Sequence, residues 1–146
     1  MTRTVADILD QAAVLVGQPG MWQQDGFRGV SGSCCAAGGI AQVIAPDDPH
    51  GDPWDLSGGR ERAELGREAA AFFAEFLRDY EDAVAFWHPS GDDEDGGELD
   101  VIETIAGWND DPRRRQSEVV SALRDAAAEW RERTEARAQR QLAGAR

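Results

Sequence analysis

Two short segments of the chain carry the residue types from which a functional site could be built. The first is residues 33–40 (SCCAAGGI) and the second is residues 105–112 (IAGWNDDP). Each joins nucleophilic or polar side chains to a predicted helix end. Neither matches a phosphate-binding loop, a paired metal-ligand motif or a nucleophile elbow, so no motif fixes a reaction.

Cys35 is the candidate nucleophile. A cysteine in the first turn of a helix has a lowered pKa, because the positive end of the helix dipole favours the thiolate. His50 or His88 would serve as the base and Asn109 as the orienting group, in the order Cys, His, Asn. A cysteine-dependent hydrolase or acyl transferase is therefore one hypothesis. The other is packing, since cysteine is often buried and the small residues after it permit close helix contact.

The same residues do not predict a metal site. Two adjacent cysteines without a Cys-x-x-Cys or His-x-x-x-His pair do not resemble a zinc site, and the acidic residues 92–95 lack the spacing of a calcium loop. We expect no metal and no other cofactor. Adjacent cysteines rarely form a mutual disulfide, so the pair suits a reducing cytoplasm.

The second segment has two interpretations. In the first, Trp108 fills the core, a side chain among residues 109–111 caps the last helix, and Pro112 lies in the first turn of that helix.

In the second interpretation, Asn109 and Asp110 face the helix that begins at the cysteines. Together with Trp22 and Gln23 they would then form a polar pocket. The sequence does not separate the two interpretations.

Charge is the extreme feature of the composition. The chain has 15 basic residues, all arginine, against 28 acidic ones, which gives a net charge of −13. Residues 113–146 carry a local +4 and residues 1–112 a local −17. We expect no direct binding of duplex nucleic acid, because such binding depends on neutralising phosphates. The basic last helix, with Arg131 and Arg137, is either a solvated face or a docking signal.

Hydrophobic periodicity predicts a mainly α fold, a compact bundle of about five helices. The predicted helices span residues 5–16, 34–44, 60–87, 99–107 and a last helix whose apolar stripe ends at Trp130. The Asp25-Gly26 pair predicts one short β-hairpin near residues 21–30. We expect a single helical domain over residues 1–134 and an exposed helical extension over 135–146. No apolar run is long enough to cross a membrane.

Several of these segments resemble a family of small actinobacterial and actinophage proteins, a domain of unknown function. The landmarks of that family are Cys-Ala-x-Gly-(Gly/Ala) and Trp-Asn-Asp-x-Pro, which residues 35–39 and 108–112 match in this chain. Arg115 and Gln116 stand where a capping Thr or Ser is expected before the last helix. The resemblance implies one compact domain and carries no activity.

Our leading hypothesis is a non-enzymatic cytoplasmic protein-binding domain, with a phage-type regulator or inhibitor of a host complex as one form of it. The partner would be another protein, with a homo-oligomer as a further arrangement. The candidate binding residues are Trp22, Gln23, Trp108, Asn109, Asp110, Arg131 and Arg137.

Overall fold

The chain folds into helices that pack on one core. The computed structural model describes residues 2–26, 29, 32–46, 60–80 and 97–145. These residues form five helices, α1 (Val5–Val16), α2 (Ala36–Ile44), α3 (Arg60–Tyr80), α4 (Gly97–Asn109) and α5 (Gln116–Gly144). The mainly α prediction is confirmed. No described helix combines the length and the apolar character needed to cross a bilayer.

Helix α1 begins and ends where its sequence predicts. The Thr4 hydroxyl accepts a hydrogen bond from the backbone N–H of Asp7 (3.2 Å), and the Asp7 carboxylate accepts one from the backbone N–H of Thr4 (2.8 Å). This capping box starts the helix and holds the pKa of Asp7 below its usual value. The opposite end caps at Gly17. Both signals are local, which is why they could be read from the sequence.

Helix α2 begins at Ala36, two residues later than predicted. Cys35 is the N-cap rather than a residue of the first turn, and its sulfur accepts a hydrogen bond from the backbone N–H of Gly38 (3.4 Å). The predicted start at residue 34 is therefore wrong. Because the Cys35 sulfur binds an N–H group of the first turn, Cys35 keeps the extended backbone of an N-cap, and the helix begins at the next residue.

Glycines let α2 lie close to its neighbours. A Cβ atom built on Gly39 would lie 2.8 Å from Cγ2 of Val16 on α1, closer than carbon atoms pack. A Cβ atom on Gly66 of α3 would collide with Cδ1 of Ile44. The tight packing expected around Gly39 is confirmed, and it accounts for glycine inside a helix despite a cost of roughly 1 kcal/mol relative to alanine.

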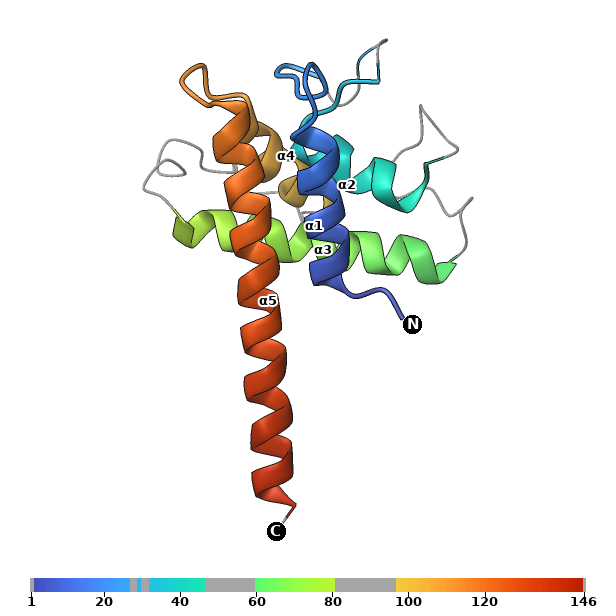
Figure 1. Ribbon diagram of the computed structural model, residues 1–146, viewed down its shortest axis with the longest axis vertical. Helices are drawn as coiled ribbons and strands as arrows, with labels where there is room; N and C mark the ends of the chain where they lie inside the picture. The colour runs from blue at the N-terminus through green and yellow to red at the C-terminus, as the bar shows by residue number, and fades with distance from the viewer. Residues whose placement is uncertain (1, 27–28, 30–31, 47–59, 81–96, 146) are drawn as a thin grey trace.

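Helix α3 supplies much of the core. Figure 1 shows it crossing behind α1 and α5, and it packs against both. Phe73 and Leu77 on α3 are fully buried, as are Ile8 and Leu9 on α1. The predicted helix over residues 60–87 is described as far as Tyr80, and residues 81–87 lie outside the described part of the chain.

The segment that leads into α2 does not form the predicted hairpin in its described residues. Trp22 instead makes a single parallel bridge with Cys34. The N–H of Gln23 donates to the carbonyl of Cys34 (3.1 Å), and the N–H of Cys34 donates to the carbonyl of Met21 (2.7 Å). Asp25 has a positive φ of 58°, and its N–H donates to Asp110 rather than across a hairpin (3.0 Å). Long-range bonds therefore replace the local pairing that Asp-Gly suggests.

Helix α5 has two different halves. Its first half runs antiparallel to α1: Gln116 donates to the carbonyl of Val16 at one end of α1 (2.7 Å), while Arg131 pairs with Asp7 in the first turn of α1 (3.7 Å). Every residue from 135 to 145 is exposed except Ala136, which is half-buried. We call residues 135–145 the projecting segment. Figure 1 shows this end of α5 extending well beyond the other helices.

Candidate functional site

The polar residues singled out in the sequence meet where α4 ends. The last residues of α4 are Trp108 and Asn109, two positions beyond the predicted end at residue 107. Asn109 contacts the extended segment around Trp22 and the first residue of α2. Of the two interpretations of residues 105–112, the structure adopts the second placement, with Asn109 and Asp110 against Trp22, Gln23 and the start of α2.

Asn109 is fully buried and joins three parts of the chain. Its Oδ1 accepts hydrogen bonds from the indole N–H of Trp22 (2.9 Å) and from the backbone N–H of Ala36 (3.1 Å). Its Nδ2 donates to the carbonyl of Gln23 (3.0 Å) and to Oδ1 of Asp110 (2.9 Å). An amide side chain can accept two hydrogen bonds and donate two, so Asn109 uses its full capacity. We call Trp22, Gln23, Ala36, Asn109 and Asp110 the Asn109 hub.

Gln23 extends the hub into the following loop. Its Oε1 accepts a hydrogen bond from the hydroxyl of Ser33 (2.7 Å), and its Nε2 donates to the carbonyl of Gly26 (2.8 Å). A Cβ atom on Gly29 would collide with Gln23 and Ser33, so the backbone there lies directly on these side chains. The Gln23 amide thus fixes the loop rather than presenting free groups to a ligand.

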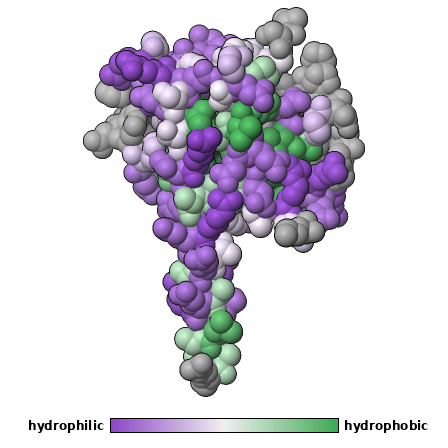
Figure 2. Space-filling model, in the orientation of Figure 1, coloured by the Kyte–Doolittle hydropathy of each residue, from purple (hydrophilic) through white to green (hydrophobic). Residues whose placement is uncertain are grey.

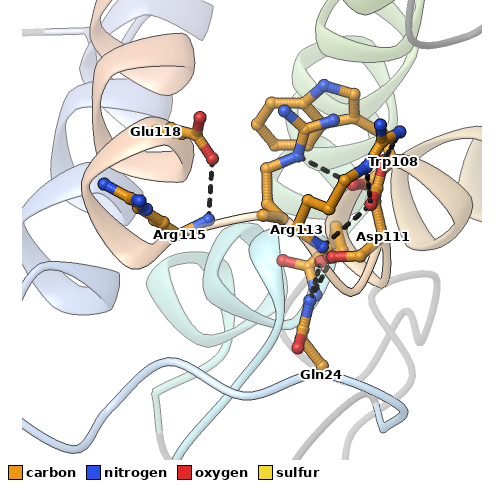
Figure 3. A network of polar contacts seen from close by, with 8 residues as sticks. Gln24, Trp108, Asp111, Arg113, Arg115 and Glu118 are labelled. Carbon is orange, nitrogen blue, oxygen red and sulfur yellow. Dashed lines mark hydrogen bonds and ion pairs between the residues drawn. The ribbon is translucent and has the colours of Figure 1, made fainter.

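Gln24 ties the same loop to the turn after α4. Its Nε2 donates to the carbonyls of Asn109 (3.0 Å) and Asp111 (2.7 Å), as Figure 3 shows. The Asp111 carboxylate accepts from the backbone N–H and the guanidinium of Arg113, and these bonds hold the pKa of Asp111 below its usual value. Residues 110–115 are therefore a bonded turn before α5.

This turn corrects the predicted cap of the last helix. Neither Asn109 nor an Asp side chain caps α5, and Pro112 lies outside its first turn. The N-cap is Arg115, whose backbone N–H donates to the carboxylate of Glu118 (2.7 Å), as Figure 3 shows. A carboxylate three residues into the helix therefore replaces the capping Thr or Ser that the sequence lacks.

Trp108 is buried, with an exposed fraction of 4%. Its ring packs edge-on against Phe73 of α3, with centroids 6.1 Å apart. The guanidinium of Arg114 lies over the ring, 4.1 Å from its centroid, and its Nε donates to the carbonyl of Trp108 (3.0 Å). The burial expected for Trp108 is confirmed. Trp108 is a core side chain and is not free to contact a partner.

Cys35 does not have the environment of a reactive thiol. It is 4% exposed and Cys34 is 1% exposed. Burial raises the pKa of the Cys35 thiol, the Asp110 carboxylate raises it further, and these effects outweigh the backbone N–H groups of Gly38 and Ala37. The lowered pKa predicted from the helix dipole is therefore wrong, because desolvation of the thiolate is the larger effect.

Of the other members of the predicted catalytic set, only Asn109 lies in the described part of the chain. His50 and His88 lie outside the described residues. The Asn109 side chain binds the groups of the hub. Among the residues that the structure describes, no group of three or more His, Cys, Asp or Glu side chains could hold a metal ion.

The two candidate arginines on α5 differ from each other. Arg131 forms ion pairs with Asp7 (3.7 Å) and Asp10 (2.7 Å) of α1, so it fastens α5 to the domain. Arg137 lies in the projecting segment and is exposed. Both are far along α5 from its start beside the Asn109 hub, so the predicted binding residues belong to two separate regions.

Several residues that build this region were not predicted. Gln24, Ser33 and Arg114 each bind backbone or side-chain groups of the hub and its surroundings. Arg114 is the middle of three consecutive arginines, and no local pattern separates it from its exposed neighbour Arg113. Gln24, next to Gln23 in the Trp-Gln-Gln-Asp run, and Ser33, the first residue of the segment 33–40, did offer a signal.

No curated protein and no solved structure matches this chain. The model of DUF6197, a family of unknown function, matches residues 1–129. The match contains the whole Asn109 hub and most of the packed part of α5, and it ends before the projecting segment. The chain belongs to the DUF6197 family.

Proposed function

We propose that this chain is a non-enzymatic protein-binding domain and that the projecting segment of α5 is its binding element. The observation that carries the proposal is the exposure of that segment, in which Leu142 is 72% exposed. Most of the stability of helices in proteins comes from packing of an apolar face, which this segment lacks on its own domain. A helical segment that buries almost nothing on its own domain is suited to bind another surface.

Charge supports the same function. Residues 113–146, which include the segment, carry a local +4, while residues 1–112 carry −17. Arg137 and Arg140 lie on one face of α5, since they are three residues apart. Such a chain offers a basic C-terminal region and an acidic body, and opposite charges on a partner would steer its approach to either.

The Asn109 hub supports a non-enzymatic function. Its polar groups bond to one another, and the thiol nearest to it is buried with a raised pKa. Nucleophilic catalysis needs a group that is accessible and activated by a neighbouring base.

A finer form of the proposal is a cytoplasmic regulator or inhibitor of a host complex, encoded by an actinobacterium or its phage. The acidic body would imitate nucleic acid on a basic host surface. The motifs shared with actinobacterial and actinophage proteins are the support for this origin.

Capture from an actinobacterial lysate tests the proposal. Full-length protein should retain a protein partner at low and moderate salt, and a chain ended at residue 134 should lose it. Arg60→Glu is the control for net charge, because Arg60 is an exposed arginine on α3, outside the segment. Recovery of no partner by a chain that is also monomeric in solution, or equal recovery with and without the segment, would contradict the proposal.

Thiol labelling tests the alternative, a cysteine-dependent hydrolase or acyl transferase. Burial of both thiols predicts that neither is alkylated at neutral pH until the chain is denatured. Rapid, pH-dependent alkylation of Cys35 in the native protein would instead favour the enzyme and count against a purely binding function.

A further inference from the structure

One face of α5 carries exposed residues along both halves of the helix. Arg124 and Ala128 lie on the packed half, and Glu135, Ala138 and Leu142 lie on the projecting segment, all exposed. Their spacings of three, four and seven residues place them on one side of the helix. Within the described part of the chain, no ion pair engages Arg124 or Glu135.

Exposed apolar side chains mark both ends of this face. Val14 of α1 is 59% exposed and Leu142 is 72% exposed, and they are the two large exposed hydrophobic residues in the described part of the chain. Figure 2 shows apolar surface on the same side of the molecule over the packed helices and near the tip of α5. Val14 stands three residues before Gly17, the C-cap of α1, where a Cβ atom would lie 3.3 Å from Cγ2 of Val120 on α5.

We propose that the projecting segment binds a second copy of this chain, in a two-fold dimer with the two α5 helices antiparallel. The inference rests on the proposed function and names the partner of the same segment. In this arrangement Glu135 of each copy lies beside Arg124 of the other, and Leu142 of each packs near Val14 and Val120 of the other.

The charges select the antiparallel orientation. A parallel pair would place Arg124 against Arg124 and Glu135 against Glu135, whereas an antiparallel pair forms two opposite-charge contacts. Arg131 then lies opposite Ala128, and its own bonds to Asp7 and Asp10 keep it directed toward α1. The small side chains of Ala128 and Ala138 allow the two helices to approach within the usual packing distance of about 8–10 Å.

The length of α5 fits the same register. Pairing of residues 124 and 135 puts the two-fold axis close to residue 130 in both copies. Leu142 then lies about 18 Å beyond the axis and meets the other helix within one turn of Val120, at a helical rise of 1.5 Å per residue. Each projecting segment thus covers the packed half of the other α5, and the contact is isologous and closed.

Charge exchange tests this arrangement by solution mass. At about 100 µM, where micromolar association gives mostly dimer, the wild type should approach twice the 15.9 kDa chain mass. Arg124→Glu alone and Glu135→Arg alone should each remain at the chain mass, because each places like charges together twice. An equal mixture of the two variants should regain the doubled mass, since both contacts are then complementary. Arg60→Glu, which changes an exposed arginine on α3 outside the proposed contact, is the control and should behave as wild type.

Three outcomes would overturn the dimer: a monomeric wild type, single variants that still dimerise, or a mixture of the variants that stays monomeric. Circular dichroism of each variant establishes that these surface changes leave the helices folded. A monomeric wild type that still captures a different protein through the projecting segment overturns the dimer and leaves the proposed function standing. Loss of both results overturns both.

Discussion

The polar side chains of the Asn109 hub are hydrogen-bonded within the chain, whereas those of the projecting segment of α5 are exposed. In the hub, both ends of the Asn109 amide are bonded to four partners. In the projecting segment, Glu135 and Arg137 are exposed and form no ion pair with the described residues. The residue types most suggestive of chemistry therefore hold the fold together, while an ordinary helical sequence offers the free surface.

The largest effect that this contrast predicts is at Trp108. Trp108→Ala should lower the free energy of unfolding by about 4 kcal/mol, because it removes a buried ring that packs on Phe73 and under Arg114. Chemical denaturation measures the change. Trp108→Phe is the matched control and should cost much less, since the indole N–H has no hydrogen-bond partner in the described part of the chain. A mild Trp108→Ala with lost partner binding would place Trp108 at a functional surface.

The second prediction removes the centre of the hub. Asn109→Leu should cost about 3 kcal/mol, because it leaves the N–H of Ala36 and two half-buried groups, of Trp22 and Gln23, without their partner. Gln24→Ala loses two hydrogen bonds at a half-buried position and should cost less, about 1 kcal/mol. Equal stability of the two variants would show that the hub is not what joins α4 to α2.

The outcome of the sequence predictions follows from the range of each interaction. The bounds of α1 were predictable, because Thr4 and Gly17 act on their immediate neighbours. The start of α2 was not, because Cys35, which is not one of the usual N-cap residues, caps it. The N–H of Ala36 is in addition bound by Asn109, 73 residues further along the chain. The hairpin failed for the same reason, since Asp110 takes the N–H of Asp25.

The sequence predicted which residues meet at the site, but not that their polar groups are bonded to one another. Trp22, Gln23, Asn109 and Asp110 meet, as the second interpretation of residues 105–112 required. The sequence does not show that their donors and acceptors bond to one another, because that depends on the orientation of each side chain. The pKa of Cys35 was misjudged because helix position is visible in a sequence and desolvation is not.

A smaller effect is expected from Cys35 at alkaline pH. Burial raises its pKa in the folded chain, so the native state keeps a proton that the unfolded chain releases. The stabilising contribution of the Cys35 thiol to the free energy of unfolding is therefore complete below the ordinary thiol pKa of 9.0. It decreases as the pH rises above that value. Denaturation midpoints at neutral and alkaline pH should diverge more for wild type than for Cys35→Ala. An equal pH dependence would contradict the burial of the thiol.

The projecting segment should contribute least to folding and most to binding. Deleting residues 135–146 should change the free energy of unfolding by less than about 1 kcal/mol, as for other surface changes, because the projecting segment is exposed. Arg131 and Arg133 remain and keep their ion pairs with α1 and α3. The truncated chain should lose association, most visibly at low salt, where charges act over longer distances. Melting temperature and solution mass of both chains decide between these outcomes: a large fall in melting temperature would show that the segment packs on its own domain, and unchanged mass and partner binding would make it a solvated extension.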